Sequence, residues 1–349
     1  MEAGPGVTGR NIRRVRIPRA GIVDVVSVPA PVPGRQDALV RTRAVGICGS
    51  DLHALTGSHP FISLPCFPGH EVVGTVEAVG SDVIDVTAGD RVLAEANLVC
   101  GHCVYCRSQR YNLCSELKVL GCQTEGAMAD LFTIPADRLH RAPEALDDSQ
   151  AALVEPLSTA THAVRMAGDL SGGTVAILGG GTVGLLCLIA ALDAGAETVA
   201  VTDLQASKRS LAIRLGAAGA IDGGSPDAVD EVKEALESRP DVTFDCVATQ
   251  ASVTQAVALA LKGGTVMVVG VPTADVVIPL PLVQDREIRI QGSAMYVRED
   301  VVRAIDLMVR GVVPSDRIVT LTLPMERAAE AFAEARSGEH VKVHLRAGA

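Results

Sequence analysis

The chain has 349 residues, of which 48% are hydrophobic and only 2% aromatic, and its formal net charge is -10. A chain of this length suggests two domains with buried cores and excludes disorder. The acidic balance and the shortage of aromatic rings exclude a nucleic-acid surface, which needs a basic stripe or stacking platforms, so a small-molecule enzyme fits better.

The first part of the chain, from about Arg13 to Asp137, consists of short apolar segments separated by glycine and proline. ALVRTRAVGI, EVVGTVEAVG and ADLFTIPADRL are examples. Such segments predict an all-β, barrel-like unit with many turns and few helices. The opening segment, MEAGPGVTGRNIRRVRIPRAG, has no apolar run after its basic residues, so we expect no secretory signal.

Four cysteines fall within fifteen residues, with the spacing C-x2-C-x2-C-x7-C: Cys100, Cys103, Cys106 and Cys114. Thiolates three residues apart on a turn can point at one ion, and a closed tetrahedron of four is typical of structural zinc. An iron–sulfur cluster is the alternative, but the ferredoxin spacing C-x2-C-x2-C-x3-C is not met. We therefore predict a structural zinc in a lobe at about residues 97–115, with His102 exposed rather than bound to the ion.

After Glu155 the chain alternates between strand-like and helix-like segments. Strand TVAILGG precedes a helix from about Thr182 to Ala194, strand TVAVTD precedes helix SKRSLAIRLG, and the alternation continues to GTVMVVGV and EIRIQGS. Strands interleaved with helices of about ten residues predict a doubly wound parallel sheet at 156–294. The tail, 295–349, has two helices and two strands, RIVTLTL and VKVHLR, and this mixed tail can complete the β unit.

One uncharged stretch, Leu170 to Leu192, is long enough to span a membrane. Glycines, three of them consecutive at 179–181, divide it into a short β-branched half and a helical half. This is the pattern of a buried strand that is followed by a helix, so we expect no transmembrane segment.

Gly179, Gly181 and Gly184 form a G-x-G-x-x-G motif between a predicted strand and a predicted helix. The glycines allow a tight turn, a close approach to a pyrophosphate and close helix–strand packing, and the helix N-terminus faces the negative charge. The next strand ends at Asp203, whose carboxylate can bind the adenosine ribose and repel a 2'-phosphate, which favours NAD over NADP. Lys208 can approach the same ribose. A turn that serves sheet packing only, with Asp203 as a helix N-cap, is the alternative. The candidate cofactor-binding residues are Gly179, Gly181, Thr182, Val183, Gly184, Asp203, Lys208, Val269 and Val271.

A second group of metal-binding residue types is dispersed: CGSDLH at 48–53, GHE at 69–71 and EP at 155–156. None of these motifs is convincing alone, since a single histidine is more often a satisfied polar residue than a ligand. Together with C-G-H-C-x2-C-x7-C, G-G-G-T-V-G and the V-T-D that ends at Asp203, all in family order, they make nearly the whole chain resemble the zinc-dependent medium-chain dehydrogenase/reductase family. That family includes alcohol, threonine and polyol dehydrogenases.

The resemblance implies a GroES-like β-barrel catalytic domain at 1–155, an NAD-binding Rossmann domain at 156–294 and a return to the catalytic domain at 295–349. It also implies two zinc ions per chain and NAD(H). Because the family is usually dimeric or tetrameric, we expect a homodimer or homotetramer. The apolar strand near residues 264 to 271 and the following PTADVVIPLPL segment are the candidate interface.

The resemblance further assigns roles at a catalytic zinc. Cys48 and His70 would bind the ion, since a thiolate and an imidazole suit zinc. Where alcohol-oxidising relatives have a second cysteine, this chain has Glu155, as in the polyol and threonine branch. Glu71 is a nearby second carboxylate; either glutamate can bind zinc while the other holds the zinc-bound water, and the sequence does not rank them. Asp51 would orient His70.

In the mechanism that the resemblance implies, zinc acts as a Lewis acid on an alcohol oxygen and a hydride passes to the nicotinamide. A proton relay would run through the Ser50 hydroxyl and the cofactor ribose to His53, which exchanges protons with solvent. Turn capping is the alternative role for Ser50 and His53. The residues with expected catalytic roles are Ser50, His53, Glu71 and Glu155.

The remaining cysteines, Cys66, Cys122, Cys187 and Cys246, are expected to be buried packing residues. Cys66 is also a conceivable rival ligand, because it lies four residues before His70. Side chains that can line a substrate pocket are Ala54, Phe61, Asn97, Gln123, Met295 and Tyr296.

These inferences predict a zinc- and NAD-dependent dehydrogenase of a secondary alcohol such as a polyol or cyclitol. An L-threonine or butanediol-type dehydrogenase on the same scaffold is one alternative. A non-catalytic zinc- and dinucleotide-binding regulator is another, against which the intact set of metal and relay residues argues. The expected partner is a small alcohol or ketone, with no nucleic acid and no membrane. Cysteines clustered as metal ligands indicate a reducing cytoplasm.

Overall fold

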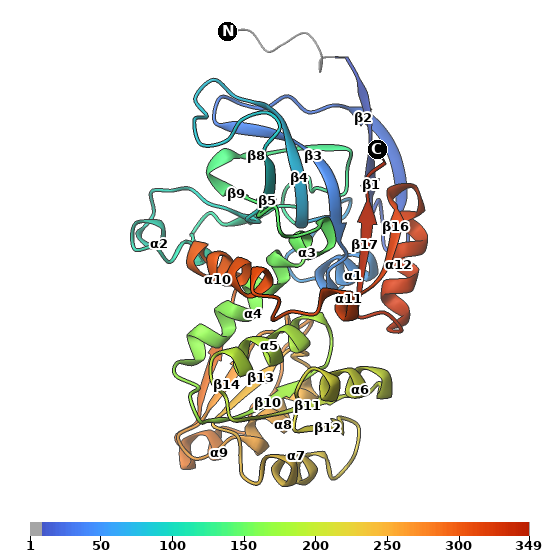
Figure 1. Ribbon diagram of the computed structural model, residues 1–349. Coiled ribbons are helices and arrows are strands. Elements are labelled where there is room, and N and C mark those ends of the chain that lie inside the picture. Colours follow the sequence, from blue (N-terminus) through green and yellow to red (C-terminus); the bar gives the residue numbers. More distant parts are fainter. Residues whose placement is uncertain (1–8, 349) are drawn as a thin grey trace. The chain divides into compact units, whose positions relative to one another are not determined.

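The computed structural model describes residues 9–348 (Figure 1). The expectation that the opening segment is not a secretory signal falls partly on residues 1–8, which lie outside the described residues. The described chain forms two compact units. One runs to Glu155 and resumes at Val297, and the other is Pro156–Tyr296. The chain therefore leaves the first unit once and returns to it near residue 297.

The first unit is mainly β structure. Its strands are β1 (Asn11–Arg16), β2 (Asp24–Pro29), β3 (Asp37–Gly46), β4 (Glu71–Val79), β5 (Arg91–Ala94), β6 (Asn97–Leu98), β7 (Lys118–Val119), β8 (Leu131–Pro135), β9 (Leu139–Arg141), β16 (Val319–Pro324) and β17 (Lys342–Arg346). Its helices are α1 (Gly49–Thr56), α2 (Val104–Arg107), α3 (Asp148–Ala152), α10 (Arg298–Val309), α11 (Ser315–Ile318) and α12 (Ala328–Ser337).

A seven-stranded sheet organises this unit, in the order β16-β17-β3-β4-β5-β9, with β8 paired to β3. The last strand, β17, runs antiparallel to β3 with His344 opposite Gly46, and β3 runs antiparallel to β4 with Gly46 opposite Glu71. The C-terminal tail thus completes the β unit, as the sequence predicted. Glu71, Gly46 and His344 lie in one row across three strands.

The second unit has a parallel six-stranded sheet in the order β12-β11-β10-β13-β14-β15. Its strands are β10 (Thr174–Leu178), β11 (Thr198–Asp203), β12 (Gly219–Asp222), β13 (Val242–Asp245), β14 (Thr265–Val268) and β15 (Arg289–Gly292). The helices after the first strand are α5 (Thr182–Asp193), α6 (Ala206–Arg214), α7 (Ala228–Leu236), α8 (Gln250–Leu259) and α9 (Leu280–Asp285). The strand order reverses between β10 and β13, which is the Rossmann arrangement and confirms the predicted fold class.

The sequence missed one long helix, α4 (Val154–Ala167). Pro156 lies in its first turn, where a residue without a backbone N–H is tolerated. The polar residues Glu155, Ser158, His162 and Arg165 follow a helical spacing that could have identified this helix. The stretch Leu170 to Leu192 divides into β10 and α5, as expected. Among residues 9–348, no helix combines the length and apolar character needed to cross a membrane.

Candidate metal centres and dinucleotide cradle

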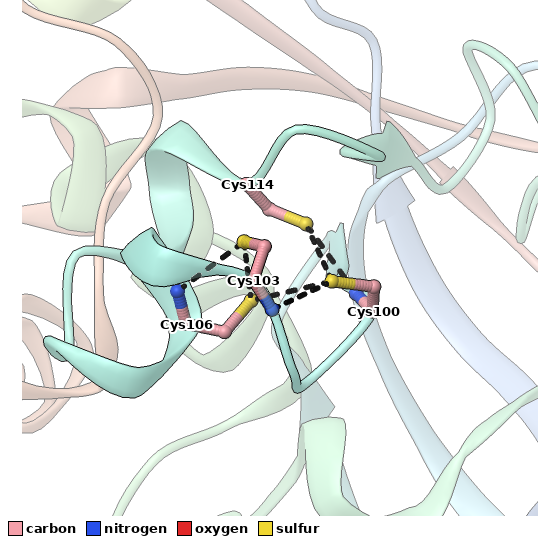
Figure 2. Close-up of side chains that lie close together, drawn as sticks. All are labelled: Cys100, Cys103, Cys106 and Cys114. Carbon is pink, nitrogen blue, oxygen red and sulfur yellow. Dashed lines mark hydrogen bonds between the residues drawn. The ribbon is translucent and has the colours of Figure 1, made fainter.

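The four cysteines of the lobe converge on one point (Figure 2). The Sγ atoms of Cys103 and Cys106 are 3.5 Å apart, those of Cys100 and Cys114 are 3.5 Å apart, and those of Cys100 and Cys106 are 3.9 Å apart. Four ligands at about 2.3 Å from a tetrahedral zinc would be separated by about 3.8 Å. The cluster therefore has the size of a closed tetrathiolate zinc site.

Backbone N–H groups stabilise negative charge on these sulfurs. The amides of Cys103 and Cys106 donate to the Sγ atoms of Cys100 and Cys103 at 3.4 and 3.5 Å, and that of Glu116 donates to Cys114 at 3.4 Å. The donation from Cys106 is the main reason that the pKa of Cys103 falls to about 5. His102 is 75% exposed and faces Glu116, as expected for a residue that does not bind the ion.

The lobe is tied to the rest of its unit through Tyr111, which lies between two of the cysteines in sequence. Its hydroxyl accepts a hydrogen bond from the backbone N–H of Arg298. Its ring packs under the Arg138 guanidinium at 5.1 Å, and Arg138 donates to the buried carboxylate of Glu95 at 3.3 Å. Zinc in the lobe would hold these contacts in place.

A second cluster brings together residues that are far apart in sequence. One ligand atom each from Cys48, His70 and Glu71 lies within 4.8 Å of the others. Cys48 is the N-cap of α1, His70 directly precedes β4 and Glu71 is the first residue of β4, so the cluster forms where β3 ends and β4 begins. Burial raises the pKa of the Cys48 thiol, and a divalent cation would offset that by binding the thiolate.

Glu71 is held by a cation that the sequence analysis did not identify, Lys342. The buried ammonium group of Lys342 donates to Glu71 Oε1 and Oε2 at 2.7 and 2.6 Å and to the carbonyl of Ile47 at 2.9 Å. The glutamate reaches across the middle strand because Gly46 has no side chain: a Cβ there would lie 1.9 Å from Glu71 Oε2. Three strands thus supply the carboxylate, the gap and the counter-ion.

The charges around Lys342 explain its protonation. Burial lowers the pKa of Lys342, but the charges of Glu71, Cys48 and Glu155 raise it above its usual value. Glu155, buried near the start of α4, therefore acts on the same cluster. His344, in the same row as Glu71, has its pKa lowered to about 4 by burial and by the charge of Lys342. The imidazole of His344 is neutral near pH 7.

The His70 imidazole of the cluster fits a metal ion, and Asp51 lies beside the cluster. His70 Nδ1 and Asp51 Oδ1 are buried and make no hydrogen bond within residues 9–348. The other oxygen of Asp51 accepts a hydrogen bond from the Cys48 N–H at 2.9 Å, so this carboxylate fixes the loop of one candidate ligand. The expected contact from Asp51 to the His70 ring is electrostatic in this structure and stays a prediction as a hydrogen bond.

The two residues of the expected relay lie on α1. Ser50 and His53 are half-buried, and burial lowers the pKa of His53, whose Nδ1 atom has no partner in the described chain. A second histidine, His59, has its ring centroid 6.4 Å from that of His53. A neutral imidazole with a free ring nitrogen is suited to accept a proton.

A pocket of about 480 Å³ opens beside the cluster. Its lining residues are Phe61, Ser63, Pro65, Cys66, Phe67, Cys122, Gln123, Thr124 and Glu125. Phe61 and Gln123 were expected to line a pocket, whereas Ala54 and Asn97 are buried and do not belong to this one. The expectation that Cys122 and Cys246 are buried was wrong, because both are half-buried.

Cys122 connects the pocket to the metal cluster. Burial lowers the pKa of His70, but the charge of Cys48 and interactions with the thiols of Cys122 and Cys48 raise it well above its usual value. Cys122 therefore lies next to the imidazole as well as in the pocket wall. A substrate in the pocket would lie beside a zinc ligand.

In the second unit, the glycine motif has the geometry of a phosphate cradle. Gly179 has φ +96°, and Gly181 is the N-cap of α5. A Cβ at Gly184 would lie 1.8 Å from the Gly179 carbonyl, so only glycine allows the helix to start this close to the strand. Thr182 and Val183 form the first turn of α5, where helix N–H groups favour an anion.

Asp203 closes the cradle at the end of β11. Its Oδ2 accepts the N–H of Gly180 at 2.8 Å and its Oδ1 accepts that of Gln205 at 2.8 Å. A Cβ on Gly180 would be 3.5 Å from the Cβ of Lys208, so the lysine borders the same space. Val269 and Val271 follow the carboxyl end of β14, the sheet edge at which cofactors bind.

Comparison with known proteins decides the family. Residues 34–144 match the alcohol dehydrogenase GroES-like domain and residues 182–310 match the zinc-binding dehydrogenase domain. The chain is 33% identical over 319 residues to sorbitol dehydrogenase of Bacillus subtilis (strain 168), covering 90% of each chain. The chain belongs to the zinc-dependent medium-chain alcohol dehydrogenase family. It is therefore an oxidoreductase that acts on CH–OH groups with zinc and NAD(P).

Other relatives of this dehydrogenase differ in substrate and cofactor. It is 32% identical over 325 residues to L-idonate 5-dehydrogenase of Vitis vinifera, covering 90% of this chain and 88% of that one. A zinc-binding dehydrogenase from Sinorhizobium meliloti 1021, solved bound to NADP, is 34% identical with a TM-score of 0.89, covering 97% of this chain and 99% of that chain. The family alone therefore fixes neither the alcohol nor the form of the dinucleotide.

Sequence reasoning missed Lys342 and the contact of Cys122 with His70. The lysine is found only in the structure, where Lys342, in the strand VKVHLR, has 3% of its surface exposed and pairs with Glu71. No signal in the sequence pointed to Cys122. The four-cysteine cluster and the glycine cradle, in contrast, were assembled as predicted.

Proposed function

We propose that this dehydrogenase oxidises a secondary hydroxyl of a polyol or cyclitol, with NAD as hydride acceptor. The observation that carries the proposal is the set of Cys48, His70 and Glu71 in one cluster, with Glu155 near it. A thiolate, an imidazole and carboxylates form a harder ligand set than the two thiolates and imidazole of an alcohol-oxidising site. The sorbitol dehydrogenase relatives support the substrate class.

We assign the zinc ligands as Cys48, His70 and a carboxylate from Glu71 or Glu155. Lys342 occupies both oxygens of Glu71 in this structure, which favours Glu155 as the direct ligand and Glu71 as the second carboxylate. When bound, zinc supplies a Lewis acid that makes the substrate hydroxyl more acidic, and NAD supplies the hydride acceptor. Asp51 fixes the loop of Cys48 by accepting its N–H.

Ser50 and His53 would carry the hydroxyl proton away. Ser50 lies two residues after Cys48 at the start of α1 and His53 lies one turn further, so the two can act in sequence. Because burial lowers the pKa of His53, its imidazole is neutral near pH 7 and can accept a proton. Loss of His53 should therefore reduce turnover near pH 7, where the neutral imidazole accepts the proton, and should matter little in acid, where the imidazole of the wild type is itself protonated.

NAD rather than NADP is proposed because of the position of Asp203. Its carboxylate borders the space between Gly180 and Lys208, where the adenosine ribose of a dinucleotide on this cradle would lie. A 2'-phosphate there would meet a negative charge. Asp203→Ser should raise kcat/KM with NADP relative to NAD, and an unchanged ratio would contradict this assignment.

The test of the main proposal is a substrate panel on zinc-loaded protein. Sorbitol, xylitol, inositol, L-threonine and 2,3-butanediol are each incubated with NAD and followed by NADH absorbance. The proposal expects turnover of the polyols or cyclitols, loss of turnover on zinc removal, and two zinc ions per chain. Turnover of threonine alone, or of butanediol alone, would contradict the polyol proposal and indicate a threonine or a butanediol dehydrogenase. One zinc per chain with no turnover of any compound would indicate a non-catalytic binding protein.

We also propose that the protein is a homodimer or homotetramer. The strand β14 is paired on both edges, so the open edge nearby belongs to β15. The segment between them exposes Val277 and Leu280 at 76% and 66%. These apolar side chains next to an open strand edge support self-association. Light scattering of wild type and Val277→Asp tests it.

The protein is proposed to work in a reducing compartment such as the cytoplasm. No disulfide joins any of its nine cysteines, all of which lie in the described residues. Five of them are metal ligands in our assignment and must stay reduced to bind zinc. Oxidation with diamide should release zinc from the purified protein.

A further inference from the structure

One wall of the pocket beside the metal cluster carries a charged residue and also contacts His70. That wall is the loop from Gly121 to Gly126, which presents Cys122 to His70 and Glu125 to the pocket. The loop is pressed against the segment before His70: a Cβ on Gly126 would lie 2.3 Å from the Pro68 carbonyl. Because the contact is backbone against backbone, the position of Glu125 relative to the metal cluster is set by the fold.

Glu125 carries the only charge among the nine lining residues, all of which are described. Its side chain is 59% exposed. Arg14 donates from Nη1 to Glu125 Oε2, and no hydrogen bond within residues 9–348 uses Oε1. That oxygen is available to accept a hydrogen bond from a substrate hydroxyl.

Arg14 lies behind the wall and does not line the pocket. Its side chain is only 4% exposed, and its guanidinium packs 5.5 Å from the centre of the Phe67 ring, which itself faces the pocket. A ligand in the pocket therefore meets the carboxylate first and the guanidinium second. The pair presents its negative end to the substrate.

We propose that Glu125, held in place by Arg14, makes this pocket select uncharged polyhydroxy substrates and reject analogues that carry a carboxylate or a phosphate. The inference rests on the proposed function and narrows its substrate class. A carboxylate accepts hydrogen bonds from hydroxyl groups, whereas like charges placed together weaken binding strongly. The distinction matters in this family because one relative is an L-idonate dehydrogenase, and idonate carries a carboxylate.

Sorbitol and gluconate form a matched pair for the test, since they differ only in one terminal carbon, CH2OH in one and carboxylate in the other. On zinc-loaded wild-type protein with NAD, kcat/KM for sorbitol should exceed that for gluconate by about a hundredfold. Glu125→Gln leaves the charge of Arg14 unpaired at the wall. This variant should lower the sorbitol-to-gluconate ratio at least about tenfold.

Arg14→Gln should move the ratio the other way, because it leaves Glu125 charged without a counter-ion. Glu116→Gln is the control: this glutamate is 64% exposed in the four-cysteine lobe, and its loss should leave the ratio unchanged. A wild type that oxidises gluconate as well as sorbitol, or a Glu125→Gln ratio equal to that of wild type, would overturn the inference and leave the dehydrogenase function standing.

A binding measurement decides the inference even if neither compound is turned over. Isothermal titration of zinc-loaded wild type and Glu125→Gln with sorbitol and with gluconate measures the ratio of the affinities for the two compounds in each protein. The expected result is at least about a tenfold gain in gluconate affinity relative to sorbitol in the variant. Equal relative affinities in the two proteins would refute the charge selection, whereas absent turnover with the expected affinities would refute only the proposed function.

Discussion

The two metal centres of the first unit are assembled in opposite ways. The four-cysteine site takes all its ligands from residues 100–114, within one lobe, and its sulfur charges are stabilised by backbone N–H groups of the same segment. The second site brings together candidate ligands from separate segments, Cys48, His70 with Glu71, and Glu155, and takes its cation, Lys342, from the last strand. Both are clusters of half-buried and buried metal-binding groups, yet only one has all its candidate ligands in one short segment.

This difference in assembly goes with a difference in chemistry. A local tetrathiolate has four similar ligands and no open position, which suits a structural ion. The dispersed site combines a thiolate, an imidazole and carboxylates with a buried ammonium group, and a pocket opens beside it. The dispersed site has different ligand types and an adjacent pocket in which a substrate can reach it, so it is the site that is suited to catalysis.

The largest expected effect is that of Cys48→Ser on activity. Loss of the thiolate should remove one zinc per chain and lower kcat/KM for the preferred polyol by at least about a thousandfold, since the Lewis acid is lost. The free energy of unfolding should change little. Zinc analysis, steady-state kinetics and urea unfolding measure the three quantities, with Cys246→Ser as a control for loss of a thiol. Full activity in Cys48→Ser would remove the distinction between the two sites.

Cys103→Ser should show the opposite combination. It should also remove one zinc, but the main result should be a loss of unfolding free energy on the order of 5 kcal/mol, a part of the ~10–16 kcal/mol with which structural zinc holds small zinc-finger folds. The protein that remains folded should keep the Cys48 zinc and its turnover per folded chain. A stable, inactive Cys103→Ser protein would be evidence against a structural role for the lobe.

Lys342→Met should destabilise the dispersed site without touching a metal ligand. It leaves the Glu71 carboxylate buried without its cation, which costs about 3–5 kcal/mol of unfolding free energy. Lys342→Arg should recover part of the loss, and Lys262→Met, at an exposed lysine, should be neutral. If the metal-free protein is as stable with methionine as with lysine, Glu71 is neutral in the folded chain and the ion pair has no energetic role.

Lowering the pH should reduce the free energy of unfolding of the protein through protonation of His344, which lies in the same row of residues as Glu71. The pKa of His344 is about 4 in the folded chain, below its usual value of 6.5, so the unfolded chain takes up the proton first. The associated stability is present above pH 6.5 and is lost as pH falls towards 4, a change of about 3 kcal/mol. Denaturant unfolding of wild type and His344→Leu between pH 7 and 4 isolates this contribution, because the acid sensitivity of the thiolate sites is common to both. Parallel pH curves would disprove it.

The features that could be predicted from the sequence are those whose residues lie close together along the chain. The four cysteines, the glycine cradle and Asp203 belong to short continuous segments, so their spacing was enough to place them together. The alternation of strands and helices identified the parallel sheet for the same reason. The family resemblance, rather than any local pattern, assembled Cys48, His70 and the two glutamates.

Contacts that depend on the packing of distant segments were not predictable. Lys342 and Glu71 are 271 positions apart, and their pairing depends on β17 lying beside β3 and on the absence of a side chain at Gly46. Arg14 and Glu125 are 111 positions apart. They meet because the loop that contains Glu125 packs closely on the segment before His70, which the absence of a side chain at Gly126 allows. Neither pair has a periodic or spaced signal in the sequence. The helix α4, in contrast, has polar residues at helical spacing, Glu155, Ser158, His162 and Arg165, and could have been found from the sequence.

The position of Lys342 in the last strand has a consequence for how the two metal sites form during synthesis of the chain. Synthesis proceeds from the N-terminus, so the four-cysteine site has all its ligands once residue 114 has emerged from the ribosome. Glu71 emerges early as well, but the cation that neutralises it is Lys342, in the last strand. We expect a nascent chain that stops short of β17 to hold its structural zinc in a folded lobe while the other site still carries an uncompensated carboxylate. The last strand to be synthesised is the one that completes the catalytic centre.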